Sequence, residues 1–255
     1  MKTSLTGVSV CAAALALVLG GGERAAADFV TYTATDAGVG PGGARPLADA
    51  SAAAFDAAAG ALGTTSLITF EGLPVGNFTT LTVAPGVSVS LTNINNSAGI
   101  TGGISNSAGS ATLGYNTTTG GSQFLSANPF LIQQQSSVTF NFASPVAAFG
   151  AYFTGLGSGV GATVHLLLND GTARDVVITG SATGGVTFFG FTDAGASLST
   201  LTLQHIPGAT GQDIYGIDDV RYTAAAVPEP GAVTLLGVGV AGLAGYGWRR
   251  RKAGC

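Results

Sequence analysis

Charged residues are scarce in this 255-residue chain: Asp, Glu, Lys and Arg make up 9% of it, against roughly a quarter in an ordinary soluble domain. Coiled coils and long charged helices are excluded, because they depend on Glu and Lys. Nucleic-acid binding is excluded, since nine basic residues among 13 acidic ones make no basic face. Charge-driven disorder is excluded too, because 46% of the residues are hydrophobic.

Cysteine and histidine are almost missing. The two cysteines, Cys11 and Cys255, lie near the chain ends, which excludes a disulfide scaffold. The two histidines, His165 and His205, do not supply the three or four suitably spaced ligands of a zinc site. No Gly-x-Ser-x-Gly motif of a serine hydrolase is present. A polysaccharide-acting hydrolase is therefore the least favoured of the function classes considered below.

The few charges are unevenly distributed along the chain. Residues 28–226 contain three arginines, eleven acidic residues and no lysine, so this span carries a formal charge of −8, whereas the whole chain carries −4. The basic residues concentrate at the two ends. The chain therefore divides into an acidic middle and two basic terminal segments, which have separate roles.

The N-terminal segment has the pattern of a secretory signal peptide. Lys2 precedes an apolar run over 8–19, and Ala25 and Ala27 form an Ala-x-Ala end. A membrane anchor is disfavoured because the apolar run is too short to span a bilayer. We predict that residues 1–27 are a signal peptide, removed by signal peptidase after Ala27.

The C-terminal segment contains three features in order. Pro228, Glu229 and Pro230 are followed by an uncharged stretch, 231–248, and then by the basic cluster Arg249, Arg250, Arg251 and Lys252. A helix over 231–248 would rise about 27 Å, close to the thickness of a thin hydrocarbon core. The basic cluster should remain cytoplasmic, with the Pro-Glu-Pro motif outside. The pattern predicts a transmembrane helix.

These three features resemble the PEP-CTERM sorting signal of Gram-negative bacteria, over residues 227–255. The resemblance implies that an exosortase, a membrane-embedded cysteine protease, recognises and removes the tail. That sorting system accompanies exopolysaccharide and biofilm production. The protein is therefore expected to cross the inner membrane, to be anchored transiently by the C-terminal helix, and to reach the cell surface or extracellular matrix.

The middle of the chain changes its hydrophobic period near residue 65. Within the N-terminal segment 28–65, apolar residues spaced for one helical face predict a helix over 46–61, with Pro46 in its first turn and Gly60 or Gly63 at its end. From residue 66 the period becomes two, which is typical of strands. About ten strands are predicted, over 67–70, 81–83, 87–92, 137–142, 146–153, 162–168, 173–179, 186–191, 198–204 and 214–222.

This pattern predicts an all-β fold for residues 66–226: a two-sheet antiparallel β-sandwich, jelly-roll-like. Asn-Asp-Gly at 169–171 predicts a hairpin turn. The stretch 93–123 consists almost entirely of Gly, Ser, Thr, Asn and Ala. Three interpretations of it stay open: a long loop, an edge hairpin or a flexible insertion.

Glu71, Asp218 and Asp219 are the candidate metal ligands. Strict alternation along the last strand places Asp218 on the core side with Val220, and Asp219 on the opposite face. A buried carboxylate is costly unless it is paired or bound to metal. Calcium, which takes six to eight oxygen ligands, is the natural metal for a structural site here. The alternative is a solvated bulge, or an ion pair of these aspartates with Arg221 or Arg174.

The segments Phe70-Glu71-Gly72 and Asp218-Asp219-Val220 also resemble β-sandwich carbohydrate-binding modules. The resemblance implies a structural calcium site formed by Glu71, Asp218 and Asp219, with Asp213 as a further candidate, and binding of extracellular polysaccharide. Tryptophan is missing from the predicted sandwich, so few aromatic side chains remain to stack on a sugar. The candidates are Tyr115, Tyr152, Tyr215, Phe124 and Phe130.

Two leading interpretations of function follow. The first is a secreted, exosortase-processed structural or adhesive protein without enzymatic activity. The second is a calcium-stabilised carbohydrate-binding module.

Overall fold

The computed structural model describes residues 29–94, 102–128, 136–158, 163–168, 175–195, 197–206, 213–225 and Leu243. The predicted signal peptide with Ala25 and Ala27, the hairpin turn 169–171, the Pro-Glu-Pro motif and the basic cluster 249–252 lie outside these residues. So does the predicted membrane span, apart from Leu243. Within the described ranges, no helix is both long enough and apolar enough to cross a bilayer.

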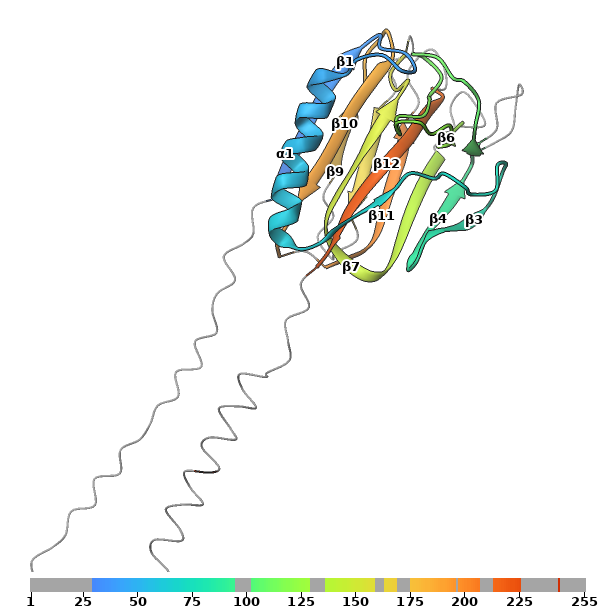
Figure 1. Ribbon diagram of the computed structural model, residues 1–255. Coiled ribbons are helices and arrows are strands. Elements are labelled where there is room, and N and C mark those ends of the chain that lie inside the picture. Colours follow the sequence, from blue (N-terminus) through green and yellow to red (C-terminus); the bar gives the residue numbers. More distant parts are fainter. Residues whose placement is uncertain are drawn as a thin grey trace, which may run out of the picture.

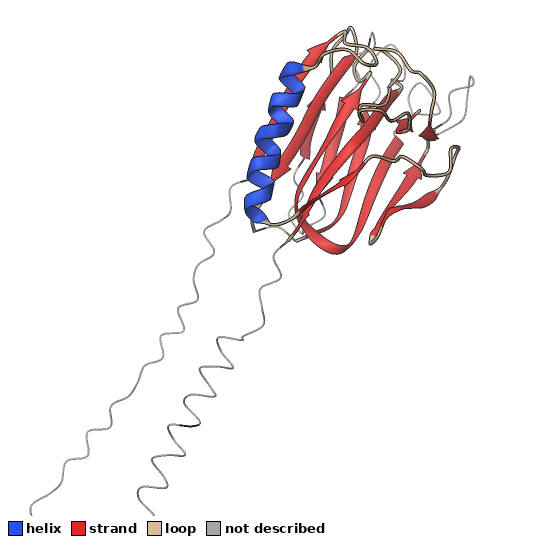
Figure 2. Ribbon diagram, viewed as in Figure 1, coloured by secondary structure: helices blue, strands red, loops and turns tan. Residues whose placement is uncertain are grey.

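The described residues form one α-helix and twelve antiparallel strands (Figures 1 and 2). In chain order these elements are β1 (Val30–Ala37), α1 (Pro46–Leu62), β2 (Thr65–Ile68), β3 (Thr80–Ala84), β4 (Val87–Thr92), β5 (Gly103–Ser105), β6 (Phe124–Ala127), β7 (Ser136–Thr154), β8 (Thr163–Leu168), β9 (Asp175–Thr179), β10 (Gly185–Thr192), β11 (Leu198–Ile206) and β12 (Tyr215–Ala224).

Strand β7 joins the two layers of the sandwich. Its first part, up to Phe142, pairs with β4 and β11, whereas its second part, from Val146, pairs with β10 and β12. One layer therefore has the order β3-β4-β7-β11-β8-β9, and the other has the order β1-β10-β7-β12. β2 and β6 follow each other along the free edge of β12, and β5 lies beyond β6. The predicted all-β sandwich with one N-terminal helix is confirmed.

The main hydrophobic core fills the space between the layers. Val138 and Phe140 on the first part of β7 face Phe149 and Phe153 on the second part, and all four side chains are fully buried. The ring centroids of Phe140 and Phe149 lie 5.3 Å apart, so this pair joins the two layers directly. The period-two pattern predicted this inward set, because alternate residues of a strand point to the same face.

Helix α1 covers the outer face of the second layer and forms a smaller core there (Figure 2). Phe55 of the helix is fully buried. It rests on Gly150 of β7 and Gly190 of β10, which are directly paired across the sheet. A Cβ atom at Gly190 would lie 2.7 Å from the Phe55 ring. The two glycines therefore make the space in which the helix docks.

The helix boundaries follow local chemistry. Pro46 occupies its first turn and Gly63 follows its last residue, as the sequence predicts. Arg45, at the N-cap position, makes no side-chain cap. Asp36 at the end of β1 takes that role instead, since its carboxylate accepts a hydrogen bond from the backbone N–H of Ala48 at 2.8 Å.

Three differences from the predicted elements stand out. The chain stays extended through Pro145, so the strands expected at 137–142 and 146–153 form the single strand β7. The carbonyl of Pro145 accepts a hydrogen bond from the N–H of Ala225. β1 and β6 were not predicted, and β5 lies in the stretch 93–123, for which an edge hairpin was one of three open interpretations. β1 pairs with β10 along its whole length, so the segment 28–65 is integrated into the sandwich.

Candidate functional site

The acidic residues of β12 lie where the strand changes its neighbour. Its free edge pairs with β6 up to Ile217 and with β2 from Val220 onward. Between these positions the register with β7 shifts, and Asp219 adopts a positive φ of 46°. Aspartate tolerates this left-handed conformation better than most residues. The chain therefore bulges at Asp218 and Asp219.

The bulge overturns the predicted alternation. Ile217 and Val220 both enter the main core, although three positions separate them. Asp218 and Asp219 do not point to opposite faces, because both carboxylates reach the hydroxyl of Thr117 at 3.0 Å. Strict alternation fails here because an extra residue in a strand moves every following side chain to the opposite face of the sheet from the one predicted.

Asp218 is the buried anchor of this arrangement, with no exposed surface. Its Oδ2 accepts hydrogen bonds from the backbone N–H groups of Thr117 at 2.6 Å and of Thr118 at 3.2 Å. Asp219 accepts a further hydrogen bond from the Thr118 hydroxyl at 2.7 Å. The two carboxylates therefore fix one turn of the segment 116–123, which we call the acid-held loop.

Glu71 joins the two ends of the same loop. It follows Phe70, which has a positive φ of 61° and is buried. One oxygen of Glu71, Oε1, accepts hydrogen bonds from the side-chain amide of Asn116 at 2.9 Å and from the N–H groups of Ser122 at 2.8 Å and Gln123 at 2.7 Å. The structure thus brings all three predicted acidic residues to one loop.

The three carboxylates nevertheless do not share one centre. Among the described residues, no three His, Cys, Asp or Glu side chains are close enough together to hold a metal ion. Asp218 and Asp219 converge at Thr117, whereas Glu71 bonds to both ends of the loop, at Asn116 and at Ser122 and Gln123. One feature favours a cation: Oδ1 of Asp218 is buried without a hydrogen-bond partner in the described structure. The calcium site remains a prediction.

Burial also perturbs the acidity of this region. Loss of hydration, and then the neighbouring charge of Asp219, raise the pKa of Asp218 to about 7. The predicted ion pair with Arg221 does not involve these carboxylates. Arg221 instead lies 3.2 Å from a carboxylate oxygen of Asp56 on α1 and donates to the backbone carbonyl of Asp219 at 2.7 Å. Arg174 lies outside the described residues.

A second buried acid lies just before β12. Burial raises the pKa of Asp213 to about 7, although the carboxylate accepts hydrogen bonds from the N–H of Gly157 and the hydroxyl of Ser158. It does not join Asp218 in a metal group. Close by, the fully buried ring of His205 stacks on Tyr215 with centroids 5.9 Å apart, and burial lowers the pKa of His205 to about 4.

A hollow of about 620 Å³ opens beside the acid-held loop. We call it the loop pocket. It is lined by parts of the β1–α1 and β5–β6 loops and by the first turn of α1, over 41–45, Asp49, 106–108 and 115–122. Arg45 lies in its wall, with its guanidinium 4.4 Å from the centre of the Tyr152 ring. This hollow was not predictable from sequence, because its walls are far apart along the chain.

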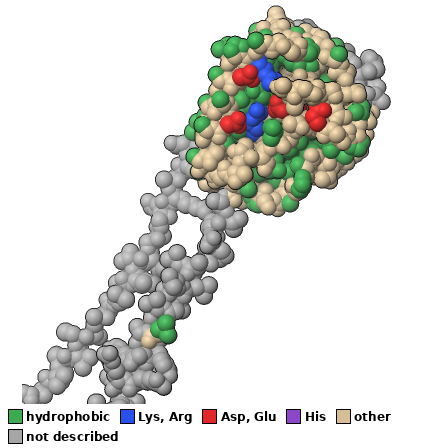
Figure 3. All heavy atoms as spheres, in the orientation of Figure 1, with side chains coloured by type: hydrophobic (Ala, Val, Ile, Leu, Met, Phe, Trp, Pro, Cys, Tyr) green, Lys and Arg blue, Asp and Glu red, His purple; other side chains and the backbone are tan. Residues whose placement is uncertain are grey.

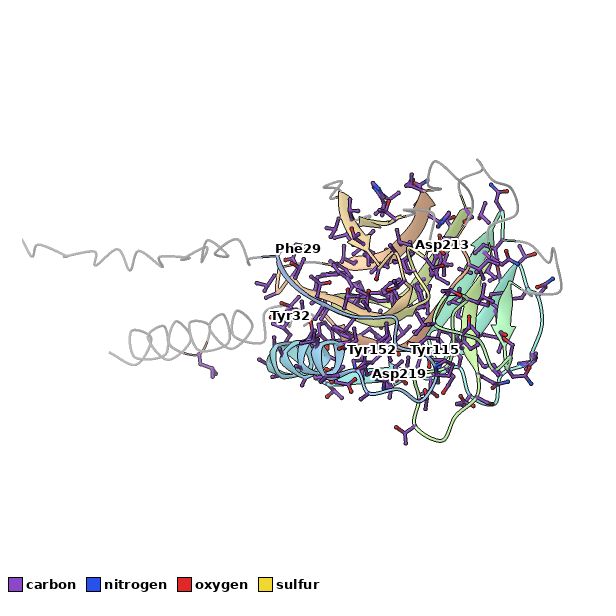
Figure 4. All side chains as sticks on the ribbon, turned by 90° about the horizontal axis from the view of Figure 1, so that it is seen from above. Phe29, Tyr32, Tyr115, Tyr152, Asp213 and Asp219 are labelled. Carbon is purple, nitrogen blue, oxygen red and sulfur yellow. The ribbon has the colours of Figure 1, made fainter. Side chains whose placement is uncertain are left out.

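Arg45 is held by three neighbours. Its Nε donates to Asp49 Oδ1 at 2.9 Å, and its Nη2 donates to the carbonyl of Thr117 at 2.9 Å. The hydroxyl of Tyr152 also donates to Asp49 Oδ1, at 2.7 Å. Figure 4 shows Tyr152, Tyr115 and Asp219 close together beside the helix, with Asp213 farther from it.

The aromatic residues predicted to stack on a sugar are buried. Tyr115, Tyr152, Tyr215 and Phe124 are each at most 3% exposed. Phe130 lies outside the described residues. Their rings pack inside the sandwich or under α1, because a hydrophobic ring on a strand next to a core is stabilised by burial. None of these four rings offers a stacking platform.

Comparison with known proteins concerns chiefly the tail. The PEP-CTERM protein-sorting motif matches residues 226–252, which contain the Pro-Glu-Pro sequence and the basic cluster. The chain carries a PEP-CTERM sorting motif. The predicted resemblance is thereby confirmed, and the motif marks an exosortase-processed protein of the cell surface.

The comparisons for the sandwich itself concern low similarities. The comparison with curated protein sequences found no match. The K2 cleaved adhesin domain of Lys-gingipain aligns over 63% of this chain and 99% of its own, with 14% identity and a TM-score of 0.41. TmCBM61 in complex with β-1,4-galactotriose aligns over 53% of this chain and 81% of its own, with 14% identity and a TM-score of 0.29.

Proposed function

We propose that the chain is a secreted, exosortase-processed structural or adhesive component of the cell surface or extracellular matrix, linked to exopolysaccharide and without enzymatic activity. The observation that carries the proposal is the sorting motif at 226–252, attached to a sandwich that holds every described strand and both hydrophobic cores. Signal peptidase and the exosortase are the processing partners.

The chemistry around the loop pocket supports a non-catalytic role. Its lining contains one carboxylate, Asp49, which is engaged by Arg45 and Tyr152. Glycoside hydrolysis uses two carboxyl groups on either side of the scissile bond. Asp218 and Asp219 are committed to the loop backbone and hydroxyls instead. Their role is to hold a loop in place.

The sorting part of the proposal is tested in the native bacterium. A blot against the sandwich should show a shortened chain in normal cells and a longer, membrane-associated chain after deletion of the exosortase. In normal cells, a chain with Pro228, Glu229 and Pro230 replaced by alanine should stay long and membrane-associated, as the wild-type chain does in the deletion strain. An unprocessed tail in normal cells would contradict the proposal. Loss of the mature chain should reduce cell or matrix cohesion without changing glycan degradation.

A calcium-stabilised carbohydrate-binding module is the second candidate, favoured by the buried, unpartnered Oδ1 of Asp218. Asp218 and Asp219 are the residues that would hold the ion, and Glu71 would support it through the loop. The cation would supply positive charge that offsets two adjacent buried carboxylates.

Thermal melting with calcium and with chelator tests this second candidate. Calcium at 100 times its dissociation constant adds about 2.7 kcal/mol to the free energy of unfolding. The shift should disappear in Asp218→Ala and persist in Ser88→Ala, a matched change on the other layer. Absence of a shift, or a shift that Asp218→Ala leaves unchanged, ends the calcium proposal.

A further inference from the structure

The loop pocket has the size and the wall of a ligand site. Its volume of about 620 Å³ falls among the ~300–1,000 Å³ hollows that hold small ligands. Apart from Arg45 and Asp49, the lining side chains are uncharged and mostly small or polar. Figure 3 shows acidic and basic side chains gathered in one group on the visible face, whose remaining surface is hydrophobic or uncharged.

One wall of the loop pocket is rigidly built. The acid-held loop is bonded at its start and end to Glu71 and in its middle to Asp218 and Asp219. Arg45 bonds to it from the helix side, through the Thr117 carbonyl. Such a loop loses little conformational freedom when a ligand binds, which favours affinity. Burying carboxylates to fix a short polar loop costs free energy. A need for one fixed loop shape, such as the wall of a binding site, explains that cost.

The polar groups in the wall define the chemistry of the ligand. The Arg45–Asp49 pair presents hydrogen-bond donors next to an acceptor, and its geometry is fixed by the ring and hydroxyl of Tyr152. On the other side Thr119 and Asn106 are exposed, and no hydrogen bond of their side chains is recorded within the described structure. Neighbouring donors and acceptors of this kind suit the adjacent hydroxyl groups of a sugar.

The charge around the loop pocket restricts the class of sugar that it can bind. Among the described residues that line the pocket, Arg45 is the only cation, and Asp49 already pairs with it. Glu71 and Asp219 stand behind the acid-held loop and add negative charge there. A uronate or another anionic sugar would meet net repulsion, whereas a neutral sugar would not.

We propose that the loop pocket binds a neutral saccharide, held by hydrogen bonds between the Arg45–Asp49 pair and the acid-held loop rather than by ring stacking. The proposal deepens the carbohydrate-binding candidate above and depends on it. The pocket borders the loop between β1 and α1, whereas β1 begins and β12 ends at the other end of the sandwich (Figure 1). The pocket therefore lies at the end of the sandwich opposite to the end where β12, the last described strand, ends.

Calorimetric titration of the chain over 28–226 tests the proposal, because all described strands and both cores lie within it. The probes are neutral gluco-, galacto- and manno-oligosaccharides, and an oligogalacturonate as the anionic comparison. We expect binding of at least one neutral series, and at least tenfold weaker affinity in Arg45→Met and in the milder Thr119→Ala and Asn106→Ala double variant. Ser88→Ala, beside a second hollow on β4, is the matched control.

The possible outcomes distinguish an error in the location of the binding site from an error in the carbohydrate-binding function. Preferential binding of oligogalacturonate would overturn the neutral ligand class. Neutral binding that survives both pocket variants, or that Ser88→Ala abolishes, would overturn the site and leave carbohydrate binding intact. No binding to any probe would overturn this proposal together with the carbohydrate-binding candidate, without touching exosortase sorting. Far-ultraviolet circular dichroism of each variant distinguishes lost binding from lost folding.

Discussion

Asp213 makes the stability of the sandwich depend on pH in a direction that the structure fixes. Burial raises the pKa of its carboxyl from 3.8 to about 7 in the folded protein. Between these values the folded state keeps a proton that the unfolded state has lost. The free energy of unfolding therefore falls as the pH rises from about 4 to about 7, and the contribution is fully present only below the unfolded pKa.

The size of the effect follows from the two pKa values. A difference of about 3 units, at about 1.4 kcal/mol each, gives a ceiling of about 4 kcal/mol. His205 acts in the opposite direction. Burial lowers its pKa from 6.5 to about 4, so its contribution is lost as the pH falls through that range. The free energy of unfolding of the wild-type protein should therefore change less with pH than Asp213 alone or His205 alone would predict.

A comparison with Asp213→Asn isolates the carboxyl. Asparagine preserves the shape and an acceptor for the Gly157 N–H but does not titrate, and His205 is common to both chains. In denaturant unfolding with chelator present, the variant should gain on wild type by up to about 4 kcal/mol between pH 4 and pH 8. A difference that stays constant across this range would refute the assignment of a raised pKa to Asp213.

Three further changes test the packing and the acid-held loop by denaturant unfolding. Phe55→Ala should lower the free energy of unfolding by about 3–5 kcal/mol because it empties the helix contact, whereas the exposed Ala53→Ser should have little effect. Gly190→Ala should cost about 1–3 kcal/mol by overpacking against Phe55, and Gly190→Ala with Phe55→Leu should cost less than the sum of the two single changes; strict additivity would contradict the contact. Thr117→Val should lower the free energy of unfolding by about 2 kcal/mol, since it removes hydroxyl hydrogen bonds to Asp218 and Asp219. An unchanged free energy of unfolding would contradict the role of these two carboxylates in holding the loop.

Much of the fold was predictable from local pattern. The strand at 87–92 and the helix that begins at Pro46 are marked by period and by proline and glycine at the ends. β5 and β6 are three and four residues long, too short for a period to show. β1 was missed although it alternates weakly. Its partner β10 lies about 150 residues away, and only that pairing makes the segment a strand.

The site was predictable in its residues but not in its geometry. Alternation along the last strand and the resemblance to carbohydrate-binding modules pointed to Glu71, Asp218 and Asp219, and all three contact one loop. The direction in which the side chains of Asp218 and Asp219 point depends on a bulge, and strict alternation does not predict bulges. The Arg45–Asp49 pair and its position over Tyr152 had no sequence signal, because they depend on how α1 docks on β7.

The account rests most directly on the fate of the tail. Intact-mass measurement of the protein released from the surface of the native bacterium should give a chain that begins near Asp28 and lacks the predicted span and the basic cluster 249–252. A surface protein that retains the full C-terminal sequence in cells with an active exosortase would contradict the account.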